Sequence, residues 1–509
     1  MMGRKAKGQQ VKMFYRGFSL EQRVRADHPL RKINQLIDFD FTYHEVAENY
    51  GINGNVSVPP PVILKLMLLL IFYNVRSERE LMATIPERLD WVWFLGLDLD
   101  DPTPNHSVLS KPRARWGSAT FKHFFERVVG QCVEAGLVDG SKIFMDSSLI
   151  QADASTESVI NRKSLKRHLK RSFRELEARL DGQPENGQGG ESANSTHVSA
   201  TDPDASIVTQ GKARSQLSYK AHRAVDERSE IITATEVTPG AVNEGRLLAA
   251  LTDQHTENTL REPEVIVADS QYGTAKNYLE CHDRGIADHI PSLKESRNRK
   301  GIFSDDAFCY DQVNDTYLCP GGNQLKRRGY DKRDETFEYQ CLGRLCKACP
   351  MHGQCTTSKE GRTIRRHLRH DEIQLMREGA QSCASKRDIR IRQHLMERSF
   401  ARAVRLGFKR ARYRRLWRVQ IQEYLTSTIQ NIMTLMRYVK EPRHAMAMAI
   451  KKAQGGKSNL SSNIQHLNVL MPSLHLYWAF FLNAFRHYRF TSRVGIIGSW
   501  QFRAELTST

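Results

Sequence analysis

Two aspartates stand at the ends of apolar, strand-like runs of the sequence. Asp146 lies in KIFMDSSLIQ and Asp269 lies in EVIVADSQYG. A single aspartate at a strand end often only caps a turn. Two central strands that each bring a carboxylate to the same end of a sheet would instead form a negative pocket, and Mg²⁺ prefers such hard oxygen ligands. The pair therefore indicates a magnesium site of the kind that supports phosphoryl transfer.

A third carboxylate is expected near this pair, and Glu397 is the best candidate. At about 100° per residue, Glu397 falls at the edge of an apolar helical arc, about 20° from Val404. We assign five residues to that arc: Ile391, Leu395, Phe400, Ala403 and Val404. The alternative for Glu397 is a solvent-facing position, where it would pair with neighbouring arginines of the helix.

Three other glutamates in the same helical region compete with Glu397. Glu372 and Glu378 flank a polar stretch that ends in Gly379, where a solvent-facing role is expected. Glu423 falls in QIQEYLTSTIQNIM, and the apolar residues of that segment indicate a helix that packs behind the core. Glu397 alone combines an apolar arc with a dense arginine surround, so we prefer it.

Basic residues are concentrated around Glu397. Between Lys386 and Arg418 the chain has thirteen lysines and arginines against two acidic residues, with Tyr413 and Trp417 interleaved. Such a density suits a nucleic-acid backbone. The whole chain has 76 Lys and Arg against 57 Asp and Glu, a net charge of +19, which favours the same partner.

Six of the nine cysteines fall between positions 309 and 355. An odd total in a long chain without a secretory signal is a poor fit to disulfides. The ligands Cys319, Cys346, Cys349 and Cys355 would complete a tetrahedral structural zinc site, and Cys309 or Cys341 could replace one of them. Free thiols are the alternative. A catalytic zinc is least favoured, because four thiolates leave no open position.

The 509 residues, of which 40% are hydrophobic, predict a folded chain of about three domains. The pattern from 140 to 295 runs strand, hairpin, helix, strand, helix, strand, which is typical of a mixed α/β sheet. His222, in the hairpin, is expected to be a packing residue more often than a ligand, and Tyr272 and Gly273 are expected to shape the turn after Asp269.

We divide the chain into five regions. They are a helical N-terminal domain at 1–135, a first core part at 140–295 with a flexible loop at about 181–205, a Cys-rich insertion at 296–365, a second core part at 366–440 and a helical tail at 441–509. A basic helix is expected at about 161–180.

The sequence predicts no membrane association. The longest apolar run, PPVILKLMLLLIFYNV at 60–75, contains Lys65 and is shorter than the roughly 20 residues that cross a bilayer. The basic N-terminus has no apolar core or cleavage site of a secretory signal, so a cytosolic location is expected.

Together these segments resemble the Asp-Asp-Glu (DDE) transposases of bacterial insertion sequences. WFLGLDLDDPTPNHSVLSKPRARW looks like the N-terminal domain of that family, MDSSLIQADAS like its first-Asp strand and SYKAHRAVD like the hairpin that follows. VIVADSQYGT looks like the second-Asp strand, and MERSFARAVRLGFKRARYRRL, followed by LTSTIQNIMTLMRY, looks like the Glu helix and its successor. Related transposases also have a Cys-rich segment between the second Asp and the Glu.

The resemblance implies a ribonuclease H-like core and a catalytic triad of Asp146, Asp269 and Glu397 that holds two Mg²⁺ or Mn²⁺ ions. It implies DNA contacts from the Glu helix and the segment after it: Arg398, Arg402, Lys409, Arg410, Arg412, Arg414 and Arg415. The family often has a Tyr and an Arg before the Glu and a Lys after it, and this chain has Arg390, Gln393 and Val404 at those places.

The function that the resemblance implies is metal-dependent cleavage at the ends of an insertion sequence and transfer of those ends into target DNA. The partners would be double-stranded DNA, as terminal inverted repeats and as target, and a second copy of the chain on that DNA. The location would be the bacterial cytoplasm, at the nucleoid when DNA is bound. The alternatives are an inactive, transposase-derived DNA-binding protein and a ribonuclease H-like nuclease without strand transfer.

Overall fold

The computed structural model describes residues 2, 19–51, 56–161, 193–209, 214–292 and 302–438, all within one compact unit, Met1–Pro442. Most of the predicted basic helix at 161–180, the first part of the loop predicted at 181–205 and the tail at 441–509 lie outside these residues. The second part of that loop is not all irregular, because α10 (Ala193–Thr196) and β3 (His197–Ser199) form there.

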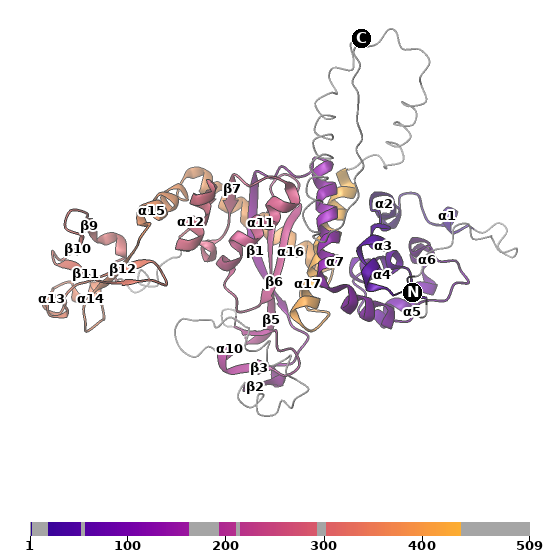
Figure 1. Cartoon of the computed structure of the whole chain (residues 1–509), viewed down its shortest axis with the longest axis horizontal. Helices are drawn as coiled ribbons and strands as arrows, with labels where there is room; N and C mark the ends of the chain where they lie inside the picture. The colour runs from indigo at the N-terminus through magenta and orange to yellow at the C-terminus, as the bar shows by residue number, and fades with distance from the viewer. Residues whose placement is uncertain are drawn as a thin grey trace, which may run out of the picture. The chain divides into compact units, whose positions relative to one another are not determined.

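Helices make up the N-terminal part of the chain, as the sequence predicts (Figure 1). They are α1 (Leu20–Arg23), α2 (Pro29–Leu36), α3 (Phe41–Glu45), η2 (Ala47–Asn49), α4 (Pro60–Phe72), α5 (Glu78–Thr84), η3 (Ile85–Glu87), α6 (Leu89–Leu95) and α7 (Ser107–Glu134). The apolar run of α4 is buried in the core on nearly every side. No helix among the described residues has the length and apolarity to span a membrane.

A six-stranded sheet carries the two aspartates. Its strands are β1 (Lys142–Gln151), β4 (Ser206–Val208), β5 (Gln216–Asp226), β6 (Ile232–Pro239), β7 (Val265–Val267) and β8 (Ala287–His289). The order is β4-β5-β1-β7-β8, and β6 also pairs with β5. β1 is antiparallel to β5 and parallel to β7, and β7 is parallel to β8. The predicted hairpin is confirmed as the antiparallel pair β5 and β6.

Helices follow and cover the strands of this sheet. They are η4 (Thr156–Ser158), η6 (Glu244–Leu247), α11 (Leu248–Thr259), η7 (Ser270–Tyr272), α12 (Ala275–Arg284), α15 (His370–Gly379), α16 (Cys383–Arg405) and α17 (Leu416–Tyr438). β2 (Val159–Asn161) pairs with β3 outside the main sheet. α16 contacts β1, and α17 contacts both β6 and α7.

A buried ion pair joins the sheet to α17. Arg223 on β5 donates from Nε to Oε1 of Glu423 at 2.6 Å, and both side chains are fully buried. Gln430 and Ser399 accept further hydrogen bonds from the same guanidinium. Removing one partner of such a pair would leave an uncompensated buried charge, so Glu423 has a structural role here.

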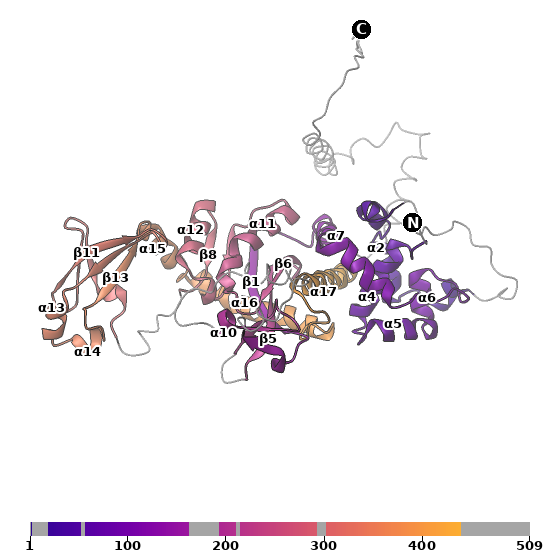
Figure 2. The same cartoon turned by 60° about the horizontal axis from the view of Figure 1, so that its bottom comes forward.

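The Cys-rich segment forms a second sheet of its own (Figure 2). Its strands are β9 (Cys309–Asp311), β10 (Thr316–Leu318), β11 (Gln324–Asp331), β12 (Thr336–Gln340) and β13 (Thr363–His367), with η9 (Asp305–Ala307), α13 (Gly343–Ala348) and α14 (His352–Cys355). Neighbouring strands are antiparallel, and a small core of Phe308, Tyr317, Leu325, Tyr339 and Ile364 holds the segment together. This segment interrupts the core between β8 and α15.

Candidate active site

Asp146 and Asp269 lie at equivalent places on two neighbouring parallel strands. Phe144 on β1 pairs with Val267 on β7, and each aspartate follows its strand partner by two residues. Parallel strands present their carboxyl ends at the same edge of a sheet, so the register brings the two carboxylates together. The structure thus joins the two aspartates that the sequence singles out.

Glu244 completes the group, and the sequence analysis missed it. One carboxylate oxygen each of Asp146, Glu244 and Asp269 lie within 4.8 Å of one another, and all three residues are partly buried. Glu244 is the first residue of η6. A glutamate in the first turn of a helix is ordinarily solvated and interacts favourably with the helix dipole. No local pattern distinguishes it, because its place beside the aspartates comes from contacts between distant segments.

The electrostatics of the group are unfavourable for three charged carboxylates. Burial raises the pKa of Asp146 to about 6, although Arg392 opposes that rise. Burial, and then the negative charge of Glu244, also raise the pKa of Asp269. Burial makes the ionised form of these carboxylates costly, and added positive charge would favour that form.

Two cations contact the group. Arg392 on α16 donates from Nη1 to Oδ2 of Asp146 at 2.7 Å, and Lys220 on β5 donates from Nζ to Oε1 of Glu244 at 3.2 Å. Three carboxylates therefore face two cations. The donor set is all oxygen and keeps a negative excess, which fits Mg²⁺ or Mn²⁺.

The side chain of Tyr272 is near enough to the same carboxylates for their charges to act on it. Tyr272 is fully buried, and its hydroxyl has no hydrogen-bond partner among the described residues. Burial, followed by the charges of Glu244, Asp146 and Asp269, raises its pKa well above the usual value. An unsatisfied buried hydroxyl next to carboxylates marks a place where an ion or a water would complete the hydrogen bonding.

The structure does not place Glu397 in this group. Glu397 is exposed on α16, and its Oε1 accepts a hydrogen bond from Nε2 of Gln393 at 3.2 Å. The buried face of α16 is formed by Ser385, Asp388, Leu395, Met396, Ser399, Phe400 and Ala403. At 100° per residue, Glu397 is turned about 140° from the centre of that face, whereas Arg392 lies on the centre.

The apolar arc that was assigned to α16 is therefore wrong in part. Ile391 and Val404 are 37% and 39% exposed, so they border the buried face rather than form it. Polar residues, among them Ser399 and Asp388, take part in that face because they meet the core strands and α17. Sequence periodicity based on apolar residues alone cannot identify a face of this mixed composition.

His222 has the packing role that was favoured for it. It is fully buried on β5, Nε2 lies 2.9 Å from Oγ1 of Thr238, and burial lowers its pKa to about 3. Gly273 shapes the turn after Asp269, because a Cβ at this position would lie 2.5 Å from the carbonyl oxygen of Pro291.

Five of the six arginines that were assigned to DNA have side-chain partners within the chain. Arg398 and Arg402 bind Glu230, and Arg410 and Arg414 bind Asp153. Lys409 is exposed, and Arg415 is partly buried, as is Arg412.

Arg412 in particular has a structural position. Its guanidinium donates to the carbonyl oxygen of Val75 and to Oδ1 of Asn74, and burial lowers its pKa. Both acceptors follow α4, so Arg412 ties the segment before α17 to the N-terminal helices and is the least available of the seven for DNA.

The sulfur atoms of the insertion gather around two loops. A Cβ at Gly321 would lie 2.8 Å from Sγ of Cys349 and 3.8 Å from Sγ of Cys319, which brings these two thiols together. Cys341 hydrogen-bonds Cys346, and its pKa is raised to about 12, mainly by burial. Backbone N–H groups of Asn323 and Arg362 point at Cys319 and Cys346. Cys309 is exposed, and all of these cysteines are free thiols.

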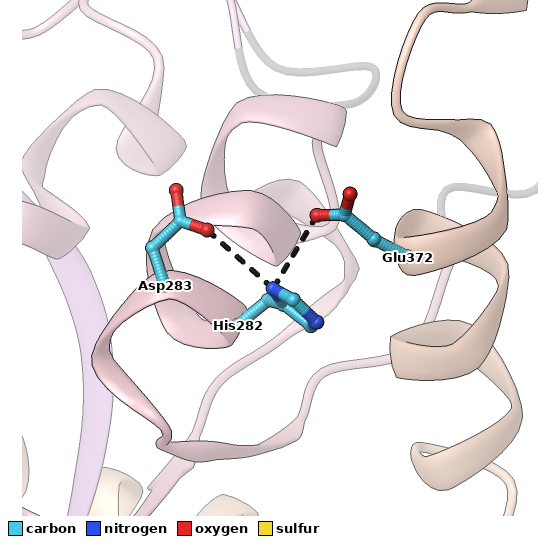
Figure 3. A group of neighbouring side chains, drawn as sticks. All are labelled: His282, Asp283 and Glu372. Atoms are coloured by element: carbon cyan, nitrogen blue, oxygen red, sulfur yellow. Dashed lines mark hydrogen bonds and ion pairs between the residues drawn. The ribbon is translucent and has the colours of Figure 1, made fainter.

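A second group of possible ligands lies between α12 and α15. His282 Nδ1 is 3.4 Å from Oδ1 of Asp283 and 3.4 Å from Oε2 of Glu372 (Figure 3). Arg369 forms ion pairs with both carboxylates. The positive charge that a metal would supply is already present, so this group is explained as an ion-pair network between two helices.

Comparisons with known proteins agree with the resemblance noted in the sequence. Residues 18–115 match the family model "Transposase domain (DUF772)" and residues 318–436 match the family model "Transposase DDE domain". These two matches, on separate parts of the chain, show that it belongs to the DDE transposases of insertion-sequence type. No curated protein matches the chain.

One solved structure found by its similarity is the piggyBac transposase synaptic complex with hairpin DNA. The two chains are 8% identical, the match covers 91% of this chain and 90% of that one, and the TM-score is 0.26. A likeness at this level carries no argument about fold or function.

Proposed function

We propose that this chain cleaves DNA at the ends of an insertion sequence and joins the freed ends to target DNA. The observation that carries the proposal is the meeting of Asp146 and Asp269 at one edge of the sheet, in a chain that matches a DDE transposase domain. Asp146 lies within β1 and Asp269 directly follows β7, and together they form a negative pocket of the kind that metal-dependent phosphoryl transfer can use.

A ribonuclease H-like core is part of the proposal. The strand order supports it, since β6, β5 and β1 are antiparallel neighbours while β7 and β8 continue in parallel on the other side of β1. This order puts β1 at the centre of the sheet, with a carboxylate partner on the strand beside it.

The residues of the chain have distinct tasks in this reaction. Asp146 and Asp269 would hold two divalent ions, Mg²⁺ or Mn²⁺, which when bound lower the pKa of a water and neutralise charge at the phosphorus. Glu397 stays a prediction as the third member of the triad. Arg392, which neutralises Asp146 here, is placed to give up that contact and face a phosphate when the site fills.

DNA binding is proposed for the exposed cations near α16 and α17. Lys409, Arg410 and Arg414 are exposed and close in sequence, and the contacts of Arg410 and Arg414 to Asp153 are surface ion pairs that a phosphate can replace. Two ends of an element must be held together for transfer, so we propose that the chain works as a dimer on DNA.

The test is cleavage of DNA that carries both flanks of the gene for this chain. With Mg²⁺ we expect wild-type protein to cut at the element ends and to join them to a second DNA, because the pocket then contains its ions. Asp269→Asn should lower cleavage by at least about a thousandfold and leave DNA binding within a few-fold.

The matched control is Asp283→Asn, which changes an aspartate of the ion-pair network and should cleave within about twofold of wild type. Cleavage by Asp269→Asn at the wild-type rate would refute the site. Cutting without joining would identify a nuclease instead of a transposase.

We also propose that the insertion binds one structural zinc ion. The proposed ligands are Cys319, Cys346, Cys349 and Cys355, and the buried Cys341, which hydrogen-bonds Cys346, is the alternative to one of them. The N–H groups that point at Cys319 and Cys346 would stabilise thiolates, as outer-shell donors do at metal sites.

Elemental analysis should find about one zinc per chain in protein purified without chelator. Cys349→Ser should lose that zinc and make the segment 302–367 sensitive to protease, since metal binding contributes to the folding of so small a core. Cys309→Ser is the matched control and should retain the zinc. Zinc-free protein with a protected insertion would contradict the proposal.

A further inference from the structure

The loop that begins at Glu244 is held against the turn that begins at Asp269. A Cβ at Gly245 would lie 2.8 Å from the carbonyl oxygen of Gln271, so only glycine allows the two segments to approach this closely. The amide of Asn277 donates to the carbonyl oxygens of Gly245 and Tyr272, both at 2.8 Å. The side chain of Asn277 therefore holds the Glu244 loop and the Asp269 turn together, so the position of Glu244 is fixed relative to that of Asp269.

Lys220 fixes the side chain of Glu244 as well as its loop. Its ammonium donates to Oε1 of Glu244 at 3.2 Å and to the carbonyl oxygen of Val242 at 3.1 Å. One oxygen of Glu244 is engaged by this contact, while the carboxylate still reaches the group formed with Asp146 and Asp269. A glutamate that only faced solvent would need neither a lysine that holds its side chain nor a glycine that lets its loop approach the turn after Asp269.

The Tyr272 hydroxyl gives an independent sign that this group holds something. It is fully buried and has no hydrogen-bond partner within the described ranges, and it is near enough to Glu244, Asp146 and Asp269 for their charges to act on it. A phenol beside free carboxylates would ordinarily donate to one of them. An ion with its bound waters between these groups would supply the missing partner.

We propose that Glu244 is a ligand of the divalent ion that Asp146 and Asp269 bind, and that Lys220 and Asn277 position it. The inference rests on the proposed function, which puts an ion at the two aspartates. It assigns to the site a carboxylate that precedes the second aspartate in the chain and comes from the hairpin side of the sheet.

The experiment is Mn²⁺ binding to the metal-free, full-length chain, followed by electron paramagnetic resonance without DNA. We expect Glu244→Gln to weaken Mn²⁺ binding by at least about tenfold, since a glutamine keeps the shape but removes the charged ligand. Glu257→Gln, which changes an exposed glutamate of α11, is the matched control and should bind as wild type does.

The outcomes separate this inference from the proposed function. Wild-type affinity in Glu244→Gln, together with lost binding in Asp269→Asn, would overturn the inference and leave the proposed function standing. Absence of Mn²⁺ binding in the wild-type chain would overturn both. If Glu244→Gln fails to fold by circular dichroism, Glu244→Asp keeps the charge and shortens the side chain, and unchanged affinity in that variant would likewise overturn the inference.

Discussion

Two groups of possible ligands in this chain have the same spacing and opposite electrostatics. In each, three ligand atoms lie within 4.8 Å of one another. Arg369 donates to Asp283 and lowers the pKa of that carboxyl to about 2, whereas burial raises the pKa of Asp146 to about 6. Close spacing alone therefore does not identify a metal site, and the excess of negative charge in the partly buried group is what favours the Asp146 group in our proposal.

The contrast between the two groups predicts opposite dependences of stability on pH. A carboxyl whose pKa is higher in the folded chain contributes its stability below the unfolded value near 4 and loses it as the pH rises through about 6. For Asp146 in metal-free protein that loss is about 3 kcal/mol, at roughly 1.4 kcal/mol per pKa unit. A carboxyl with a lowered pKa, such as Asp283, contributes its stability above pH 4 and loses it as the pH falls toward 2.

Urea unfolding of metal-free protein between pH 4 and 7 measures this difference. Asp146→Asn should gain stability relative to wild type as the pH rises across that range, because the variant lacks the buried charge. Asp283→Asn should show no such gain, and its deficit should shrink only below pH 4. A difference between Asp146→Asn and wild type that stays constant with pH would contradict the account.

The ion-pair network should tolerate loss of its arginine. Arg369→Met removes the contacts to Asp283 and Glu372, and we expect only a small decrease in melting temperature because exposed ion pairs contribute little. Cleavage and Mn²⁺ affinity at the Asp146 group should stay within about twofold of wild type. A large loss of activity in this variant would show that the second group takes part in the reaction.

Much of the fold follows from local patterns in the sequence. The strands that contain Asp146 and Asp269, the hairpin between them and the helices after it are found where alternation and turn residues predict them. Each aspartate could be singled out from its own segment of the sequence, because a charged residue beside an apolar, strand-like run is unusual.

The rest of the site depends on contacts between distant residues. Glu244 looks like any acidic residue at the start of a helix, and only the approach of Gly245 to Gln271 brings it to the aspartates. Arg392 was counted among the basic residues of its helix, but its position at the centre of the buried face gives it a contact with Asp146. Such roles are set by the packing of α16 and η6 on the sheet, which residue types do not reveal.

Arg412 illustrates the same limit for a charged residue. In the sequence it is one arginine within a basic run, and in the structure it binds Asn74 and the carbonyl oxygen of Val75. A guanidinium with these partners stabilises the junction between α4 and the segment before α17. Composition predicts how much positive charge a segment has, whereas partners decide which of those charges can meet DNA.

The central claim is that the group of Asp146, Glu244 and Asp269 binds a divalent ion and that the ion-pair network between α12 and α15 does not. Crystals of the protein soaked in Mn²⁺ would test it most directly, through the anomalous scattering of manganese. We predict a peak bounded by the carboxylates of Asp146, Glu244 and Asp269, and no peak at His282, Asp283 and Glu372. Manganese at the second group with none at the first would contradict the account.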